Sequence, residues 1–416
     1  MDNTDLYEQL RRLGLARGAQ GIRAKPRRRA RPIEALLPGE VQHTEHGPFF
    51  LYRESHPLDF QHGAHRLGDL LRHSPESAAR LARDERLSGV EFERLAFIDT
   101  ETTGLAGGTG TYAFLVGVGV LGPQGFTIHQ FFMRDFDEEP AQLEALGRLL
   151  DGLEAVVSFN GKSFDLPLLE TRFVMARQPP RLMGAPHLDL LPVARRFWKY
   201  RLPSCALSSL EAEVLGVQRT QADVPGWLIP SLYVDYARSG NAGEMPRIFY
   251  HNAQDILSLV TLMARTCTLL EAPLPPPEDL PGEDLFGLGR ILHDLGDWER
   301  AEVAYLRAAE SIQAPPLRET AMRHLAYLLK RQERRAEALP WWQRLVEVDG
   351  AVYACEELAK HYEWQDVDLE QALAWTRQGI GLVEAWPPGS RRRDTLADLA
   401  HRLQRLERKI AEPSSS

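Results

Sequence analysis

The stretch Leu95–Gly104, with the sequence LAFIDTETTG, decides the fold class that the chain is expected to have. Four mostly apolar residues lead to Asp99, which predicts a buried strand, and Glu101 follows after one intervening residue. Alternate side chains of a strand lie on one face, so these two carboxylates should point the same way. Neighbouring carboxylates repel each other unless a cation lies between them, and oxygen ligands favour Mg²⁺ or Mn²⁺. The stretch therefore predicts half of a metal site; two solvated acids at a strand end are the alternative.

Length and composition set the general class of the protein. The 416 residues allow two or three domains, and 44% hydrophobic residues can fill their cores. No apolar run is as long as a membrane span and the N-terminus lacks a signal-peptide pattern, so we expect a soluble, cytoplasmic protein without a membrane partner. Cys205, Cys267 and Cys355 are isolated, which favours a reducing compartment and a role in core packing. The net charge of −9 does not by itself indicate a nucleic-acid partner.

Composition also predicts the domain organisation. The N-terminal tail is basic and should be disordered, either contacting phosphates or only aiding solubility. Five prolines in the nine residues from Pro273 to Pro281 exclude a helix or a central strand and predict a linker. The expected segments are a tail (1–35), a hairpin and helical segment packing on the next domain (36–90), an α/β domain (91–271), the linker (272–282) and helical repeats with a capping helix (283–411).

The α/β domain has a recognisable order of predicted elements. Two strands (112–121 and 126–134) follow the opening strand, and a helix (138–153), a short strand (155–159) and a second helix (163–175) come next. Residues 182–247 are expected to be mostly helical, and residues 245–270 to form a long final helix. This order resembles the opening of a ribonuclease H-like fold, which implies a mixed central sheet flanked by helices.

Small and bulky residues recur after the linker at fixed offsets. The three copies are Ala301, Tyr305, Ala308; Ala338, Trp342, Leu345; and Ala372, Thr376, Gly379. Their periods of 37 and 34 residues resemble those of tetratricopeptide helical hairpins, which imply an all-α domain. Leucines and an isoleucine between Leu396 and Ile410 then follow the spacing of an amphipathic capping helix.

Two further acids have a context that matches the opening pair. Asp165 follows a short strand and a turn at Asn160–Gly161, and Asp255 lies on the predicted final helix. Four carboxylates from two strand ends and two helices could hold two cations about 3.5 to 4 Å apart, an arrangement that activates phosphodiester hydrolysis.

These motifs in this order resemble the three exonuclease motifs of the DnaQ-like, or DEDD, branch of the ribonuclease H-like superfamily. More narrowly, TETTGLAGGTGTY (Thr100–Tyr112), VPGWLIPSLYVDY from Val224 and the helical repeats resemble the YprB-like predicted exonucleases. The resemblance implies that Asp99, Glu101, Asp165 and Asp255 bind two Mg²⁺ or Mn²⁺ ions, and that cleavage runs from 3′ to 5′.

The fourth motif departs from the family pattern. DEDD enzymes place a histidine five residues before the last aspartate or a tyrosine four residues before it, whereas this chain has Tyr250 and His251 at those positions. Residues four apart share a helix face, so His251 faces the same way as Asp255, and imidazole is the better base near neutral pH. We therefore expect His251 to be the general base and keep Tyr250 as the alternative. The third possibility is that His251 has no direct catalytic role and that catalysis is weak or absent.

Other residues near these motifs are candidates for substrate contact. They are Thr102, Asn160, Lys162 and Phe164, although an ordinary exposed turn lysine is the favoured interpretation of Lys162. Asp189 could support the ligands or cap a helix. The aromatic residues Phe197, Trp198 and Tyr200 could stack on bases, but core packing is the favoured interpretation.

These observations predict a metal-dependent 3′-to-5′ exonuclease with a slight preference for single-stranded DNA over RNA. The helical repeats would bind a protein partner or help to bind nucleic acid. Two alternatives remain: a non-catalytic nucleic-acid-binding scaffold, and a structure-selective endonuclease.

Overall fold

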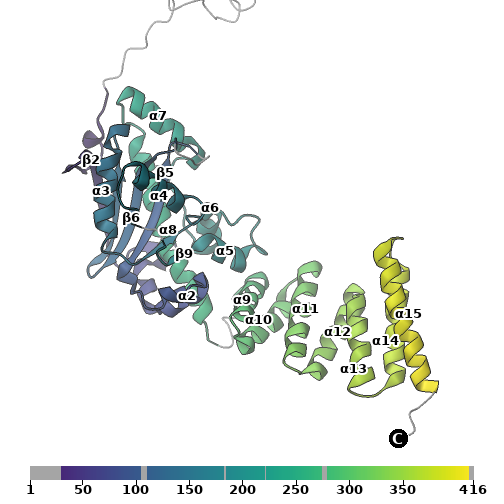
Figure 1. Cartoon of the computed structure of the whole chain (residues 1–416). Helices are drawn as coiled ribbons and strands as arrows, with labels where there is room; N and C mark the ends of the chain where they lie inside the picture. The colour runs from purple at the N-terminus through teal and green to yellow at the C-terminus, as the bar shows by residue number, and fades with distance from the viewer. Residues whose placement is uncertain (1–29, 105–109, 182–183, 221, 274–278, 412–416) are drawn as a thin grey trace, which may run out of the picture.

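The computed structural model describes residues 30–104, 110–181, 184–220, 222–273 and 279–411. An α/β domain is followed by a row of helices that extends away from it and ends at α15 (Figure 1). This confirms the expected fold class, a mixed sheet flanked by helices followed by an all-helical region. Within the described residues, no helix combines the length and the apolar character needed to cross a membrane.

A seven-stranded mixed sheet forms the centre of the α/β domain, in the order β1-β2-β7-β6-β5-β8-β9. Strand β5 pairs antiparallel with β6 and parallel with β8, and β8 pairs parallel with β9. The strands are β1 (Glu40–Thr44), β2 (Gly47–His56), β5 (Leu95–Thr102), β6 (Ala113–Gly122), β7 (Gly125–Phe132), β8 (Ala155–Ser158) and β9 (His187–Asp189), with β3 (Gln61–His62) and β4 (His65–Arg66) in a separate pair.

The hairpin expected within residues 36–90 is present as β1 and β2. Strand β2 pairs antiparallel with β7 from Phe50 to His56, so the hairpin adds two strands to the central sheet. Described structure extends N-terminal to the predicted boundary at residue 36: Ile33–Ala35 forms a helical turn, and Ile33 is buried in the aromatic cluster that contains Tyr236. The rest of the predicted tail, residues 1–29, lies outside the described residues.

Helices cover both faces of the sheet because β5 is apolar on both sides. Ala96 and Ile98 pack against α3 (Glu139–Leu150) and α4 (Asp165–Met175), whereas Leu95 and Phe97 lie in the cluster that contains α8 (Met245–Glu271). The other helices of this domain are α2 (Pro75–Ala82), α5 (Leu190–Trp198), α6 (Leu207–Leu210) and α7 (Ile229–Ser239). Odd-numbered side chains of β5 therefore face α8, and even-numbered ones face α3 and α4.

Residues 182–247 contain α5, α6 and α7, in keeping with the expectation of a mostly helical segment, but part of this segment is not helical. Strand β9 lies within it, and the described residues from Gly216 to Pro225 contain no regular helix. Gly216 has a left-handed backbone (φ 67°) that ends the preceding helical turn, and Pro225 limits helix formation at the other end. This irregular segment supplies residues to the site described below.

Each C-terminal helix contacts the next one along the chain. These helices are α9 (Gly282–Asp294), α10 (Trp298–Ser311), α11 (Pro315–Arg331), α12 (Arg335–Asp349), α13 (Val352–Trp364), α14 (Leu369–Glu384) and α15 (Ser390–Ala411). The repeated positions are buried, and a Cβ on Gly289 would lie 2.7 Å from the ring of Tyr305, which explains the small residue there. The helical region is thus established, while its membership of the tetratricopeptide class stays a prediction.

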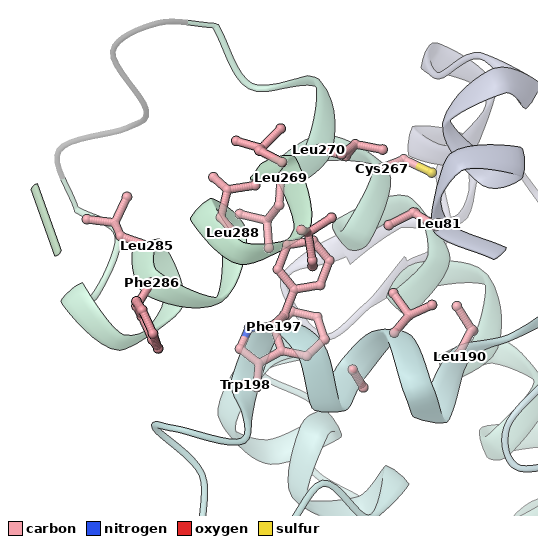
Figure 2. Packing of buried hydrophobic residues seen from close by; sticks show 14 of the residues in the cluster. Leu81, Leu190, Phe197, Trp198, Cys267, Leu269, Leu270, Leu285, Phe286 and Leu288 are labelled. Atoms are coloured by element: carbon pink, nitrogen blue, oxygen red, sulfur yellow. The ribbon is translucent and has the colours of Figure 1, made fainter. Parts of the chain in front are cut away.

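Helix α9 joins the two parts of the molecule by packing on α5. Phe197 and Trp198 lie in this buried cluster, close to Phe286 and Leu288 (Figure 2). A Cβ on Gly287 would lie 2.2 Å from the carbonyl oxygen of Phe197, so only glycine permits this approach. Core packing is therefore confirmed for these two aromatic residues, and they are not available to stack on bases.

Candidate active site

Strand β5 presents Asp99 and Glu101 on the face that is covered by α8. Thr100 and Thr102 alternate with them and are buried toward the opposite face. A register shift between Glu101 and Thr102 ends the regular pairing with β6 at this point. The strand thus ends with two carboxylates on one side, as its sequence predicts.

Helix α8 holds Asp99 through Asn252. The Nδ2 atom of Asn252 donates to Oδ2 of Asp99 at 2.8 Å and to its carbonyl oxygen at 3.2 Å. Gln130 on β7 donates to Oδ1 of Asn252 at 2.8 Å, which fixes the orientation of the amide. The helix can come this close because β6 has glycine at Gly117, where a Cβ would lie 2.2 Å from Oδ1 of Asn252.

Asp165 begins α4, and the turn before this helix is held by Asp189. The carboxylate of Asp189 accepts from the backbone N–H groups of Asn160 (2.8 Å) and Lys162 (3.2 Å), and it also caps α5 by accepting from Leu191. Asp165 accepts a hydrogen bond of 2.5 Å from the hydroxyl of Thr100. Because Thr100 points to the α4 side of β5, the carboxylate of Asp165 is engaged on the opposite side from that of Asp99.

Asp255 lies on α8 in an ion pair with Arg219, which comes from the irregular segment. The same guanidinium donates to both carboxylate oxygens of Glu211 at 2.7 Å and lies 3.5 Å from Asp223. The side chain of Arg219 is largely buried, with an exposed fraction of 13%. A single cation therefore neutralises several carboxylates at the site, including one of the four predicted metal ligands.

His251 faces the carboxylates, one helical turn before Asp255. Its Nε2 atom lies 3.7 Å from Asp255 and 4.0 Å from Glu101. Its Nδ1 atom lies 2.7 Å from Oδ1 of Asp223 and 3.0 Å from Nη1 of Arg219. Asp223 is the nearer partner and can only accept, so it favours the tautomer with the proton on Nδ1, which leaves the lone pair of Nε2 facing the carboxylates.

Tyr250 points to a different neighbour. Its hydroxyl accepts a hydrogen bond of 3.4 Å from the backbone N–H of Thr220. The geometry therefore brings His251, not the Tyr250 hydroxyl, into the described contacts with Glu101 and Asp255.

Burial and mutual repulsion dominate the electrostatics of the site. Burial, then the charges of Asp255 and Asp165, raise the pKa of Asp99 well above its usual value, while Asn252 and Arg219 oppose this. Burial and the other three carboxylates similarly raise the pKa of Glu101. Burial raises the pKa of Asp165 to about 6, against the hydrogen bond from Thr100. The negative charge of the ionised carboxylates is thus not fully compensated by nearby positive groups. A bound cation would supply the missing positive charge.

The donor chemistry fits a divalent cation, but the side chains are not assembled around one. Buried oxygen ligands suit Mg²⁺ or Mn²⁺. In the described part of the chain, however, no group of three or more histidine, cysteine, aspartate or glutamate side chains is spaced to hold a metal ion. The contacts explain this: Arg219 binds Asp255, and Thr100 binds Asp165. Each contact occupies one oxygen of its carboxylate, so these two acids can share cations either through their second oxygens or after the donors are displaced.

The other predicted substrate contacts lie around this site. The hydroxyl of Thr102 donates to the carbonyl oxygen of Gly104 at 2.9 Å. Asn160 and Lys162 are exposed, Asn160 has a left-handed backbone (φ 66°), and Phe164 is half-buried at the start of α4. Lys162 lines a hollow together with Arg83, Asp189 and Arg196.

Four residues of the site were not anticipated from the sequence: Glu211, Arg219, Asp223 and Asn252. Asn252 lies three residues before Asp255, so helical spacing could have placed it beside that acid. Asp223 directly precedes the VPGWLIPSLYVDY motif. Arg219 and Glu211 have no comparable pattern, because their role depends on contacts with α8 across more than 30 residues of sequence.

Comparison with known proteins agrees with this architecture. Residues 96–267 match the family model described as the RNase_H superfamily. The chain is also 29% identical over 343 residues to "Uncharacterized protein YprB" of Bacillus subtilis (strain 168), and the match covers 80% of each chain. Residues 96–267 are therefore similar to the RNase_H superfamily, and the chain resembles YprB over most of its length.

Proposed function

We propose that this protein is a metal-dependent 3′-to-5′ exonuclease that acts on single-stranded nucleic acid, with DNA slightly preferred over RNA. The observation that carries the proposal is the pair Asp99 and Glu101 on one face of β5, within the electrostatic reach of Asp165 and Asp255. The nuclease fold of residues 96–267 supports phosphodiester hydrolysis, while polarity and the preference for DNA rest on the family resemblance.

The four carboxylates would hold the cations of the reaction. When bound, two Mg²⁺ or Mn²⁺ ions supply charge stabilisation of the phosphate and activation of the attacking water. The protein's own part is to position these acids: Asn252 orients Asp99, and the turn held by Asp189 places Asp165 at the start of α4.

His251 is the proposed general base. Asp223 binds the Nδ1 side of the ring, so Nε2 can take a proton from a water molecule that lies between the imidazole and the carboxylates of Glu101 and Asp255. Asp223 would also stabilise the imidazolium that forms. This arrangement favours His251 over Tyr250, whose hydroxyl is bound to the backbone at Thr220.

The experiment is cleavage of end-labelled single-stranded DNA and RNA with Mg²⁺, Mn²⁺ or EDTA. The variant Asp99→Asn keeps the size of the side chain and can still accept from Asn252, so a loss of activity would report the missing charge. Asp235→Asn, an exposed acid on α7, is the matched control. Thermal unfolding of both variants verifies that the fold is retained.

A second function, that of a non-catalytic nucleic-acid-binding scaffold, is favoured by one observation. Arg219 already neutralises Asp255, Glu211 and Asp223, as expected for a site that works without a metal. A scaffold should bind single strands without cleaving them and should bind Mn²⁺ no better than the Asp99→Asn variant does. Circular single strands separate a third reaction, endonuclease cleavage, from an end-dependent one.

A further inference from the structure

Trp227 lies in the open beside the candidate active site. It is 74% exposed, more than any other large hydrophobic residue in the described ranges. It belongs to the VPGWLIPSLYVDY motif, in the short turn Gly226–Leu228 that leads into α7. Leaving an indole in water is unfavourable, so an exposed tryptophan at a functional site calls for a partner that covers it.

The exposure does not result from a loosely held segment. The backbone N–H of Leu228 donates to the carbonyl oxygen of Pro225 at 2.8 Å, and Pro230 lies in the first turn of α7. Ile229 is fully buried in the cluster that contains Phe114 and Tyr233. The residues on either side thus fix the turn while the indole of Trp227 remains outside.

The turn is also fixed against the proposed general base. A Cβ on Gly226 would lie 3.8 Å from Nε2 of His251, so the backbone next to Trp227 passes directly beside the catalytic face of the ring. Asp223, four residues before Trp227, binds the other side of the same imidazole at 2.7 Å. Arg247 anchors the segment by donating to the carbonyl oxygen of Asp223 at 2.6 Å. The backbone that carries the exposed indole is therefore held beside the proposed reacting groups.

The surrounding charge indicates what could cover the indole. Glu101, Asp223 and Asp255 all lie around His251, and the guanidinium of Arg219 offsets only part of their charge, so an anionic group is disfavoured there unless further cations are bound. A nucleobase is flat and uncharged, and it stacks on an aromatic ring without regard to its identity. It suits the position next to the carboxylates better than a phosphate does.

We propose that Trp227 is a stacking platform for a nucleobase near the 3′ end of a bound single strand. This inference rests on the proposed function, because it assumes that the strand enters the site formed by Asp99 and Glu101. Stacking on Trp227 would align the terminal nucleotide beside His251 independently of base identity. It would also disfavour duplex ends, whose bases are already stacked and paired.

The test is the binding of single-stranded DNA of about 12 nucleotides to full-length protein, within the range of common single-strand site sizes. The Asp99→Asn background keeps the strand intact while Mn²⁺ is present to offset the remaining carboxylates. Two fluorescently labelled strands are compared by anisotropy: one with an ordinary 3′-terminal nucleotide and one with an abasic 3′-terminal nucleotide. The variants are Trp227→Ala, Trp227→Phe and the control Trp364→Ala, which removes another exposed tryptophan (60%) in the helical region.

Stacking predicts that Trp227→Ala weakens binding of the ordinary strand about 10-fold, whereas Trp227→Phe retains most of the affinity. The background protein should bind the abasic strand about 10-fold more weakly than the ordinary strand. Trp227→Ala should bind the two strands with equal, weak affinity. Trp364→Ala should keep the full difference between the two strands. Equal affinity of Trp227→Ala and the background protein, or the same abasic penalty in both, would overturn the inference.

The outcome can be separated from that of the proposed function. If the wild-type protein cleaves nothing but binding still depends on Trp227 and on the terminal base, the exonuclease proposal fails and the platform stands. If the wild-type protein cleaves single strands and Trp227→Ala binds and cleaves them normally, the platform fails and the exonuclease proposal stands.

Discussion

Nδ1 of His251 lies 2.7 Å from Oδ1 of Asp223, while Nε2 of the same ring faces Glu101 and Asp255. This arrangement has the geometry of a base that is oriented by an acid. Asp223→Ala should therefore lower kcat about 10- to 100-fold with little change in KM, because the imidazole loses its orientation while the carboxylates stay in place.

Removal of the ring itself should cost more. We expect His251→Ala to lower kcat about 10²- to 10⁴-fold, the usual contribution of a general base. Tyr250→Phe is the control, since it removes only a hydroxyl that is bound to the backbone at Thr220. Steady-state rates on one oligonucleotide decide the assignment, and it is reversed if Tyr250→Phe is inactive while His251→Ala is not.

Arg219 provides a prediction about metal affinity. Its guanidinium forms an ion pair with Asp255 and would compete with a metal ion for this carboxylate. Arg219→Gln should therefore raise the apparent affinity for Mn²⁺ about 10-fold, or 1.4 kcal/mol. Without metal the same variant should be less stable by about 3 kcal/mol, because buried carboxylates lose their counter-ion. Isothermal titration with Mn²⁺ and thermal unfolding in EDTA measure the two effects.

The control for this experiment is Arg53→Gln, which breaks an exposed ion pair with Glu40. It should change neither quantity appreciably. A variant at Arg219 that is destabilised in EDTA but binds Mn²⁺ with unchanged affinity would show that the arginine is structural and does not compete with the metal.

Gly117 tests how closely α8 must approach the sheet. A methyl group there would collide with Oδ1 of Asn252 and with Ile256, whose Cδ1 atom would be 2.4 Å away. Gly117→Ala should destabilise the protein by about 1–3 kcal/mol and reduce activity by displacing the amide that holds Asp99. Gly89→Ala, where a Cβ has open space, is the control for chemical denaturation and for activity.

His62 predicts a pH dependence of stability. Burial, followed by the charge of Arg219, lowers its pKa to about 4, and its Nε2 lies 2.8 Å from the hydroxyl of Ser258. The unfolded chain binds a proton near pH 6.5, so between pH 6.5 and 4 it holds more protons than the folded chain, and stability falls as the pH falls. The loss from this group approaches roughly 3 kcal/mol at pH 4.

His62→Gln keeps a donor to Ser258 but does not titrate, so it should flatten this dependence in urea unfolding at a series of pH values. Part of the slope should remain, because burial also lowers the pKa of His129, His187 and His324 to about 4. Exposed His43→Gln should leave the slope unchanged. An identical slope in His62→Gln and the wild-type protein would contradict the assignment.

Much of the architecture could be predicted because its cause is local. The apolar run before Asp99 indicates a buried strand, and the repeated small residues such as Ala301 and Ala308 indicate close helix packing, as observed. The position of His251 relative to Asp255 follows from helical spacing alone.

The contacts made by the irregular segment could not be predicted in this way. Arg219 and Asp223 lie in the stretch from Gly216 to Pro225, which has neither helical nor strand periodicity, and they meet α8 only after the chain has folded. Similarly, no local pattern shows that Thr100 engages Asp165 on the opposite side of β5 from Asp99. Tertiary contacts therefore determine how the carboxylates are arranged, although sequence motifs determine which carboxylates they are.

The central claim is that Asp99 belongs to a metal-dependent nuclease site, and one measurement tests it most directly. A single strand labelled at its 5′ end is incubated with wild-type protein, Asp99→Asn and Asp235→Asn, each with Mn²⁺ or with EDTA. The account predicts a ladder of products shortened from the 3′ end by the wild-type protein and Asp235→Asn with Mn²⁺, and an intact strand in every other reaction. Cleavage in EDTA, equal cleavage by Asp99→Asn, or no cleavage by the wild-type protein with Mn²⁺ would contradict it.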